Sequence, residues 1–390
     1  MVTEGIERAG GAEEYLSDVV SGLRREGDEV SVLFGRDPAK ESEAIEQLSE
    51  GGVLVEGLDR ARSIREMRRI SPDVINFQGV PDPELLEESV RIAPRTVFLH
   101  NHESYCPGNS KYFFVSGKVC DLPVSLFCGL NAFSQNCMSR RPFKMVSAIR
   151  GRWQSLKALS RIKKIMCNSQ HVKQNLLLNG FSGEKIVVNH LFPRIYAEEA
   201  FVGEEEGTDP PIILFVGRLF KEKGVDHFLR ALAGVKLSYQ AVVVGEGWER
   251  VVLERLAAEL GIGEKVEFKG FVRREEVARL YRSACLLVMP SLWGEPFGLV
   301  GVEALSLGLP VVAYGVGGIP EWLESGKSGF LVEAGRIDLL SENIGRLVRD
   351  QALAKQLGQA GKKIVAERFT LRQHLENLRK VYREVIDYGM

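Results

Sequence analysis

Two glutamates, Glu295 and Glu303, interrupt the small and apolar stretch SLWGEPFGLVGVEALSLGLP at residues 291–310. In one helix they would lie about 80° apart, so they cannot share a face closely. The residue before a proline is disfavoured in the α region, so Glu295 is predicted to end a loop before a helix over 297–308. A helix start at Gly298 would offer backbone N–H groups to a phosphate. Taken alone, the pair also fits a solvated helix start.

A second set of reactive side chains lies in GRLFKEKG, residues 217–224, after the apolar run IILFV. Arg218 and Lys223 would stand at the carboxyl end of a parallel strand, the edge where open α/β sheets bind ligands. A guanidinium and an ammonium group both bind phosphate oxygens, so this segment and the helix start predict a diphosphate clamp. Glu303 would then accept two ribose hydroxyls, and Glu295 would contact a sugar.

The elements that must position these residues are short apolar runs that alternate with helical patterns. The runs are EVSVLF, DVINFQ, RTVFLH and KKIMC in the first half, and IILFVG, AVVVGEG, KVEFKG and CLLVMP in the second. Such alternation predicts parallel sheets with crossover helices, twice over. The expected class is therefore α/β with two doubly wound, Rossmann-like domains.

The domain boundaries follow from length and composition, because 390 residues exceed one compact core. We expect an N-terminal domain over 1–195, with a cysteine-containing insertion near 103–142, and a C-terminal domain over 196–370. The acidic stretch at 194–211 is the linker between them. The amphipathic helix at 371–390 is expected to pack back on the first domain. The first strand looks clipped, so we expect a start codon upstream.

Composition narrows the function classes. The formal net charge of −1 and the sequence pI of about 6.6 give no case for nucleic acid, which needs a strongly basic surface. The sequence has no apolar run of about 18 residues and no secretory-signal pattern, which favours a soluble cytoplasmic protein. Six cysteines are too few for a disulfide scaffold.

The motifs GRLFKEKG, PSLWGEPFGLVGVEALSLGLPVVA and GVGGIPEWLESGKSGFLV together resemble the donor half of family 4 glycosyltransferases over about residues 211–370. Glu295 and Glu303 fit that family's pattern of two glutamates separated by seven residues. The resemblance implies two facing domains of the GT-B type. It also implies retaining transfer of a sugar from a nucleotide-diphosphate sugar, such as a UDP or GDP sugar, in glycan, glycolipid or polysaccharide biosynthesis.

Residue roles follow from the same resemblance. It implies that Arg218 and Lys223 hold the diphosphate and stabilise its departure. Backbone N–H groups of Gly298 and Leu299 would also bind the diphosphate. Glu295 would contact sugar hydroxyls and Glu303 the ribose. The other positions that it implies in the donor half are Lys269, Gly270 and Phe271 beside the base and Glu321 near the cleft.

In the first half, Gly10 and Gly11 resemble the family's turn near the donor phosphates, although a glycine pair before a helix is also ordinary turn chemistry. His100 ends a strand where the family commonly has His followed by Asp. Here Asn101 follows, so an acid/base pair is not expected and His100 fits an orienting role near the reacting sugar. A lone histidine at a strand end also fits a structural residue. No Asp-x-Asp pair occurs, so catalysis implies no metal cofactor.

Four cysteines follow His100 within about thirty residues, and this number is sufficient for structural zinc, with His100 or His102 as further ligands. Their spacing lacks a CxxC pair, so buried free thiols are the alternative. Cys167 and Cys285 lie in strand patterns and are expected in the core. The four cysteines are Cys106, Cys120, Cys128 and Cys137.

From Leu122 to Gly183 the chain carries ten Lys or Arg residues and no Asp or Glu. A charge run is usually a solvated face, yet apolar residues and Trp153 are interleaved in helical fashion. That pattern is typical of segments that lie on anionic membranes, and it would suit a lipid-linked acceptor at the inner membrane face.

Three rival functions remain open on sequence grounds. A nucleotide-sugar epimerase shares the two-domain architecture and would need no acceptor. A sugar-nucleotide binding protein without catalysis is the non-enzyme alternative. A dinucleotide oxidoreductase fits less well, because VVGEGWER lacks the third glycine of the phosphate fingerprint.

Overall fold

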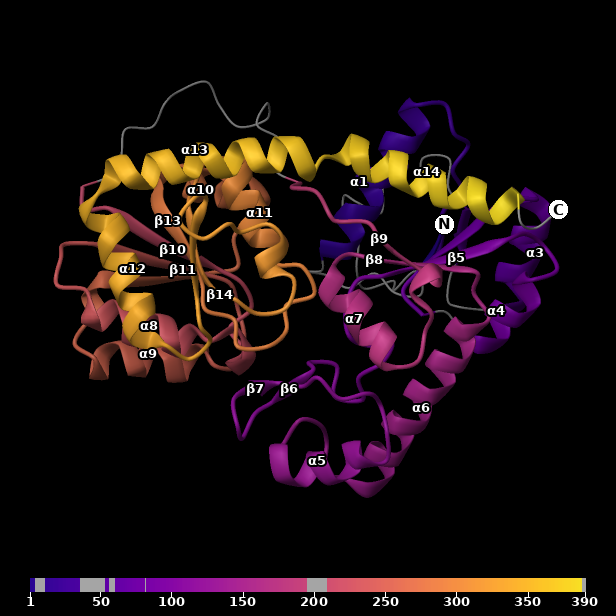
Figure 1. Ribbon diagram of the computed structural model, residues 1–390, viewed down its shortest axis with the longest axis horizontal. Helices are drawn as coiled ribbons and strands as arrows, with labels where there is room; N and C mark the ends of the chain where they lie inside the picture. Colours follow the sequence, from indigo (N-terminus) through magenta and orange to yellow (C-terminus); the bar gives the residue numbers. More distant parts are fainter. Residues whose placement is uncertain (4–10, 36–52, 56–59, 81, 195–208, 388–390) are drawn as a thin grey trace. The chain divides into compact units, whose positions relative to one another are not determined.

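The protein is described here from a computed structural model that covers residues 1–3, 11–35, 53–55, 60–80, 82–194 and 209–387 (Figure 1). The chain divides into two compact units. The first contains Met1–Ser110, Asp121–Arg194 and Leu371–Met390, and the second contains Lys111–Cys120 and Ile195–Thr370. Gly10 and nearly all of the acidic linker lie outside the described residues.

The first unit is built on a parallel sheet of seven strands in the order β3-β2-β1-β4-β5-β8-β9. Its strands are β1 (Val2–Thr3), β2 (Leu33–Gly35), β3 (Val53–Val55), β4 (Ile75–Gln78), β5 (Arg95–Leu99), β8 (Lys164–Cys167) and β9 (Ile186–Val188). Its described helices are α1 (Gly11–Arg25), α3 (Arg60–Ile70), α4 (Pro83–Ser89), α5 (Phe127–Gln135), α6 (Pro142–Ser160), α7 (Gln170–Leu178), the short η1 (Gly183–Lys185) and α14 (Leu371–Asp387).

The last helix, α14, belongs to this first unit although it ends the chain. It packs against α1 and against β5, and Figure 1 shows it beside α1. Leu375, Leu378, Val381 and Val385 are buried on one face, as their helical spacing requires. Each such apolar side chain contributes roughly 1.5–3 kcal/mol when fully buried.

A projection of the first unit is formed by α5 and α6. Figure 1 shows α6 running away from the sheet, with α5 beside its far, amino-terminal end. The two helices pack together where Gly129 of α5 faces Met145 of α6. Only part of the cysteine-containing segment before α5 belongs to this unit, because Lys111–Cys120 belongs to the second unit. Its hairpin, β6 (Tyr112–Phe113) paired with β7 (Lys118–Val119), groups with the second unit.

The second unit has a parallel sheet of six strands in the order β12-β11-β10-β13-β14-β15. Its strands are β10 (Ile212–Val216), β11 (Gln240–Val244), β12 (Val266–Gly270), β13 (Ala284–Met289), β14 (Val311–Tyr314) and β15 (Gly329–Val332). The helices are α8 (Val225–Gly234), α9 (Arg250–Glu259), α10 (Arg274–Ser283), α11 (Leu299–Ser306), α12 (Ile337–Arg349), α13 (Gln351–Arg368) and the short η2 (Lys221–Lys223), η3 (Gly263–Lys265) and η4 (Ile319–Glu321).

Both sheets are wholly parallel, which confirms the predicted α/β class with two Rossmann-like domains. The strands of a parallel sheet are covered on both faces, so their residues are apolar in continuous runs. In β10, for example, Ile213, Leu214 and Phe215 are all buried. The sequence pattern did not single out β14 and β15 as strands. The helix predicted over 297–308 begins two residues later, because Gly298 adopts a left-handed conformation with φ of 86°.

Candidate functional site

The loops after β10 and β13 lie side by side at the carboxyl edge of the second sheet, because these two strands are paired. A backbone hydrogen bond of 2.8 Å from Leu292 N to Glu222 O joins the two loops. Gly224 closes the first loop with φ of 66°, and a Cβ there would lie 2.1 Å from the carbonyl oxygen of Pro290. Only glycine fits this left-handed, crowded position.

Glu295 is the most enclosed carboxylate of this edge, with 5% of its surface exposed. Its Oε1 accepts from Lys223 Nζ at 2.5 Å and from Ser291 Oγ at 2.7 Å. Burial alone raises the pKa of the Glu295 carboxyl, but the Lys223 charge and three side-chain hydrogen bonds outweigh it and lower the pKa. The carboxylate is therefore ionised at neutral pH while almost out of contact with water.

The Lys223 ammonium group is fixed from two sides. Besides the Glu295 carboxylate, it lies 5.0 Å from the ring centroid of Trp293, a cation–π contact. Its side chain keeps 18% of its surface exposed, so it is still reachable from solvent. A charged ligand that binds here would therefore meet an ammonium group whose direction is already set.

The backbone of Glu295 is held by the glycine-rich loop that follows β14. Gly318 N donates to Glu295 O at 2.8 Å. Gly317 has φ of 61°, and a Cβ there would lie 2.1 Å from the same carbonyl oxygen. Gly317 and Gly318 thus bring their backbone into direct contact with the backbone of Glu295.

The helix α11 starts directly beyond this cluster. Gly298 is its N-cap, and a Cβ there would press against Met289, Ile319 and Trp322. The first amides of any α-helix, here from Leu299 onward, lack partners within the helix and attract anions. Trp322 helps to fix the start of α11, because its Nε1 donates to Phe297 O at 2.6 Å.

Glu303 lies in the second turn of α11 and is buried, with 6% of its surface exposed. It therefore does not sit on a solvated helix face. Its main-chain oxygen accepts from Ser306 Oγ at 2.7 Å.

Arg218 follows β10 but is not joined to the Glu295 cluster by a described contact. It is exposed, and its guanidinium carbon lies 4.9 Å above the Phe220 ring. Phe220 in turn stacks on Trp248, with ring centroids 5.2 Å apart and planes 9° apart. The Arg218 guanidinium therefore lies on a stack of two aromatic rings.

The residues expected beside the nucleotide base lie at the end of β12. Lys269 pairs with Glu267 at 2.9 Å, and Gly270 has φ of 73° and accepts from Gly245 N at 2.8 Å. Phe271 exposes 71% of its surface, which makes it an available stacking platform. Glu321 lies in η4, where it is half-buried and its main-chain oxygen accepts from Arg368.

His100 lies at the carboxyl end of β5 in the first unit. Its Nε2 is 2.8 Å from Gln78 Oε1 and donates to that oxygen, and its ring packs against Tyr15 and Phe98. Burial lowers the pKa of His100 to about 3, with a smaller contribution from His374, so the ring is neutral near pH 7. Gly11 is the first residue of α1.

A second buried histidine, His374 of α14, lies beside this strand end. Its Nδ1 donates to His190 O at 2.8 Å, so its Nε2 accepts from Tyr15 OH at 2.8 Å. Burial lowers the pKa of His374 to about 4. Asn101 has a turn role instead, because its side-chain oxygen accepts from Glu103 N at 3.0 Å.

All six cysteines are free thiols, and within the described ranges no three His, Cys, Asp or Glu side chains are placed to hold a metal ion. Structural zinc at these cysteines stays a prediction from the sequence. Cys120 also belongs to the second unit, whereas Cys106, Cys128 and Cys137 belong to the first. Cys167 is buried in β8, and burial raises the pKa of Cys285 in β13 to about 12.

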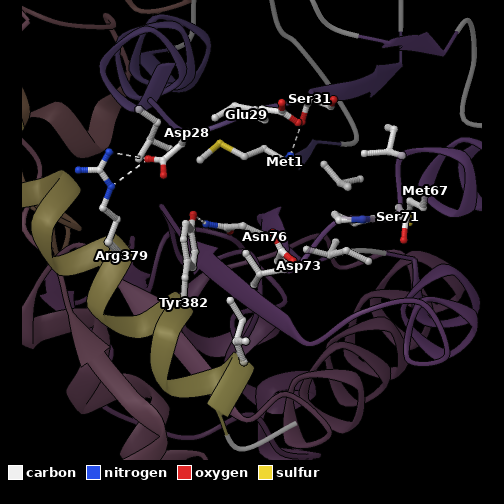
Figure 2. Close-up of a pocket in the computed structure, with 18 of the residues that line it drawn as sticks. Met1, Asp28, Glu29, Ser31, Met67, Ser71, Asp73, Asn76, Arg379 and Tyr382 are labelled. Carbon is white, nitrogen blue, oxygen red and sulfur yellow. Dashed lines mark hydrogen bonds and ion pairs between the residues drawn. The ribbon is translucent and has the colours of Figure 1, made fainter. Parts of the chain in front are cut away.

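A cavity of about 730 Å³ lies at the opposite, amino-terminal edge of the first sheet (Figure 2). In Figure 2, two residues of α14 close one side, where Arg379 pairs with Asp28 at 2.5 Å and Tyr382 OH accepts from Asn76 Nδ2 at 2.5 Å. Ligands of open α/β sheets usually bind at the carboxyl ends of strands, which is the other edge of this sheet.

Sequence reasoning missed Ser291, Trp293 and Gly317, all of which touch Glu295 or its lysine partner. Ser291 stands four residues before Glu295 in PSLWGE, a spacing that allows a local hydrogen bond. Gly317 lies 22 positions beyond the glutamate, and no local pattern connects the two. The expected roles of Lys223 and Glu295 were also separate, whereas the structure joins them in one ion pair.

Comparison with known proteins places this geometry in a family. The model described as Glycosyl transferases group 1 matches residues 197–364, and the model described as Glycosyltransferase Family 4 matches residues 9–191. An uncharacterized glycosyltransferase of Methanocaldococcus jannaschii is 31% identical over 214 residues, which are 54% of this chain and 54% of that protein. The chain spans about half the length of such curated relatives.

Solved structures share the whole fold at low identity. Sucrose-phosphate synthase from Thermosynechococcus elongatus superimposes with a TM-score of 0.71 at 19% identity, covering 99% of both chains. Anabaena HepE in complex with UDP and glucose gives a TM-score of 0.71 at 18% identity, covering 98% of this chain and 99% of that one. With both halves matched by family models and the whole fold shared, this chain belongs to the GT-B glycosyltransferases of the family 4 type.

Proposed function

We propose that this protein transfers a sugar from a nucleotide-diphosphate sugar to a hydroxyl acceptor, with retention of the anomeric configuration. The observation that carries the proposal is the ion pair of Lys223 and Glu295, held nearly dry at the carboxyl edge of the second sheet beside the start of α11. A fixed ammonium group and free helix amides suit a diphosphate, and the neighbouring carboxylate suits sugar hydroxyls.

The diphosphate would be bound from three directions. Lys223 supplies a point charge, Arg218 a planar fork that can swing over from its aromatic base, and Leu299 and the preceding Gly298 supply backbone amides. These groups are attractive to the leaving diphosphate as its negative charge grows. A preorganised donor of this kind typically lowers the barrier by about 3–4 kcal/mol.

The two glutamates would bind different parts of the donor. Glu295 would accept hydroxyl protons of the sugar, and its low pKa keeps it an acceptor at neutral pH. Glu303, buried in the second turn of α11, would take the ribose hydroxyls. Phe271, exposed beside Lys269 and Gly270, would stack on the base.

Retention follows if the acceptor approaches from the face that the diphosphate leaves. The bond between the anomeric carbon and the phosphate oxygen breaks, and a bond to the acceptor oxygen forms. The acceptor proton passes to the departing phosphate oxygen, so no protein base is needed. His100 fits an orienting role, because its lowered pKa leaves the ring neutral and its Nε2–H already donates a hydrogen bond to Gln78 Oε1.

The acceptor in this proposal is a glycan or lipid-linked hydroxyl, and the protein works as a peripheral protein at the inner membrane face. No helix of the described residues has the length and apolarity to cross a bilayer. The support for a lipid-linked acceptor is the segment 122–183, which combines basic and apolar side chains and has no Asp or Glu.

The test begins with nucleotide binding. Thermal unfolding is measured with UDP, GDP, ADP, dTDP and CDP, and UDP leads because HepE, which shares the fold, was solved with it. A ligand at about 100 times its dissociation constant adds about 2.7 kcal/mol of stability. We expect one diphosphate to stabilise the protein and Glu303→Ala to abolish that shift.

Turnover is tested with the sugar nucleotide of the base so identified. Arg218→Ala should lose turnover by roughly two to three orders of magnitude with an unchanged melting temperature, because Arg218 is exposed. NMR of the product should show the donor's anomeric configuration. No shift with any diphosphate, or near-normal turnover of Arg218→Ala, contradicts the clamp. A changed sugar nucleotide formed without acceptor favours the epimerase.

A further inference from the structure

Exposed apolar side chains are unevenly spread over this protein. Of the fifteen large apolar residues that are exposed within the described ranges, eight lie between Leu122 and Trp153. Single exposed apolar residues are ordinary on a protein surface, but a dense group on one projection marks an interaction site. This group lies on α5, on α6 and on the turn before α5. The eight are Leu122, Leu126, Phe127, Leu130, Phe133, Phe143, Val146 and Trp153.

The apolar residues of α5 are only partly covered by its neighbour. Gly129 faces α6, where Met145 lies within 3.7 Å of a Cβ built at Gly129, and Ala132 is buried. Leu126, Leu130 and Phe133 follow one another at helical spacing on the flank next to Gly129 and are exposed. The fold of the chain therefore covers only part of the apolar surface of this helix.

The helix α6 also carries apolar residues that its own fold leaves uncovered. Ile149, Ala158 and Leu159 are buried. Exposed residues follow one another at intervals of three and four, which defines a single outer stripe along the helix. Phe143, at the end far from the sheet, exposes 91% of its surface. The stripe reads Phe143, Val146, Arg150, Trp153 and Lys157.

Basic side chains border and interrupt the apolar stripes. Ten Lys or Arg residues and no Asp or Glu occur from Leu122 to Gly183. Arg140, Arg141 and Lys144 stand at the amino end of α6, beside α5, and Arg150 and Lys157 belong to the outer stripe itself; all five are exposed. The surface thus offers apolar side chains and positive charge together.

We propose that this surface, the α5–α6 face, binds an anionic lipid membrane. The apolar residues would enter the boundary between headgroups and acyl chains, and the basic residues would meet the lipid phosphates. The proposal rests on the proposed function in one respect, because it assigns the acceptor to the membrane. A helix that carries Phe, Leu and Trp beside Lys and Arg binds such an interface both by burying apolar surface and by electrostatic attraction to anionic lipids.

Charge argues against the other natural occupant, a second copy of the chain. A two-fold contact would place the same surface against itself, so the basic residues of two copies would face one another without a carboxylate in the segment to compensate. Like charges brought together in an apolar contact are costly, whereas anionic headgroups neutralise them. The membrane is therefore the occupant that fits both chemistries.

The experiment measures co-sedimentation of the full chain with phosphatidylcholine vesicles that contain or lack phosphatidylglycerol. We expect binding to the anionic vesicles, little binding to the neutral ones, and loss of binding as salt is raised. Arg141→Gln combined with Lys144→Gln should weaken the partition coefficient by roughly tenfold or more. Phe127→Ser combined with Phe143→Ser should weaken it at least as much.

Matched controls carry the same exchanges on the second unit. Lys362→Gln with Lys363→Gln removes two charges from α13, and Val251→Ser with Val252→Ser removes two exposed apolar residues from α9. These should leave vesicle binding unchanged. All variants replace exposed residues, so their melting temperatures and their diphosphate-induced shifts should match those of the parent protein.

Three outcomes overturn the inference. Equal binding to vesicles with and without phosphatidylglycerol counts against it. Equal effects of the α5–α6 variants and their controls also count against it. A dimer in sedimentation velocity that dissociates in Phe127→Ser with Phe143→Ser would assign the face to a second copy instead. If the diphosphate still raises the melting temperature while vesicle binding fails, only the membrane inference is refuted, and the proposed sugar transfer is not.

Discussion

Two polar clusters lie at the carboxyl ends of the two sheets, and burial affects them in opposite ways. In the second unit Glu295 is 5% exposed yet ionised, because Lys223 and Ser291 contact its carboxylate. In the first unit His374 is 2% exposed and His100 is partly exposed, and both rings are neutral, because burial lowers their pKa and their contacts among the described residues are with uncharged groups. A buried group keeps its charge when a counter-charge is buried with it.

The two clusters therefore suit different tasks. A charged carboxylate and ammonium beside the α11 start are suited to binding a charged ligand. Neutral imidazoles that donate and accept hydrogen bonds join the end of β5 and α14 to their neighbours within the first unit.

The largest expected effect on stability follows from removing the counter-charge of Glu295. Lys223→Met leaves the Glu295 carboxylate buried without its partner, so we expect the free energy of unfolding to fall by about 3–5 kcal/mol. Adding Glu295→Gln should restore most of this loss, because no charge is then buried. Denaturant unfolding of the single and the double variant measures these changes in the free energy of unfolding. Lys221→Met, at an exposed position of the same loop, is the control, and an equal loss in that control refutes the pairing argument.

Acid should act on the first unit through its neutral histidines. Their pKa values in the folded protein, about 3 for His100 and about 4 for His374, lie below the unfolded value of about 6.5. The unfolded chain therefore binds more protons between these values, and stability falls as pH drops from about 6.5 to 4. For His374 the integrated loss is about 3 kcal/mol.

The measurement compares unfolding of the parent protein and of His374→Gln between pH 7 and pH 4. The variant loses hydrogen bonds to Tyr15 and His190, so it starts less stable at pH 7, but its stability should depend less on pH. His171→Gln, in the half-buried first turn of α7, is the matched control. Parallel pH curves for the parent and His374→Gln would show that this ring does not titrate as inferred.

The smallest expected effect on stability is that of a serine next to Glu295 in the second unit. Ser291→Ala removes a 2.7 Å hydrogen bond to the ionised Glu295, which should cost about 1.5 kcal/mol while Lys223 still holds the charge. It should also raise the pKa of Glu295 and weaken sugar-nucleotide binding. Ser306→Ala, which removes a bond to a backbone carbonyl, should cost about 0.5–1 kcal/mol and leave binding unchanged. Equal effects of the two serines on binding would count against the role of Ser291.

The sequence predicted the parts whose signals are local. Apolar runs such as IILFVG and RTVFLH mark strands because a parallel sheet buries both faces, and Pro296 with Gly298 marks the end of a loop. The same local reading overlooked β14 and β15, which lie inside motifs read for their chemistry. It also started α11 too early, because a proline such as Pro296 is accepted in a first helical turn as well as in a loop.

What the sequence determined by itself was the class of fold and the kinds of chemical group that stand at strand ends. Tertiary structure decided which groups meet. Lys223 and Glu295 are 72 positions apart and pair because β10 and β13 are neighbours, and Tyr15 and His374 are 359 positions apart and meet because α14 packs on α1. Contacts across such separations depend on how elements pack, and packing also sets the burial that makes one cluster charged and the other neutral.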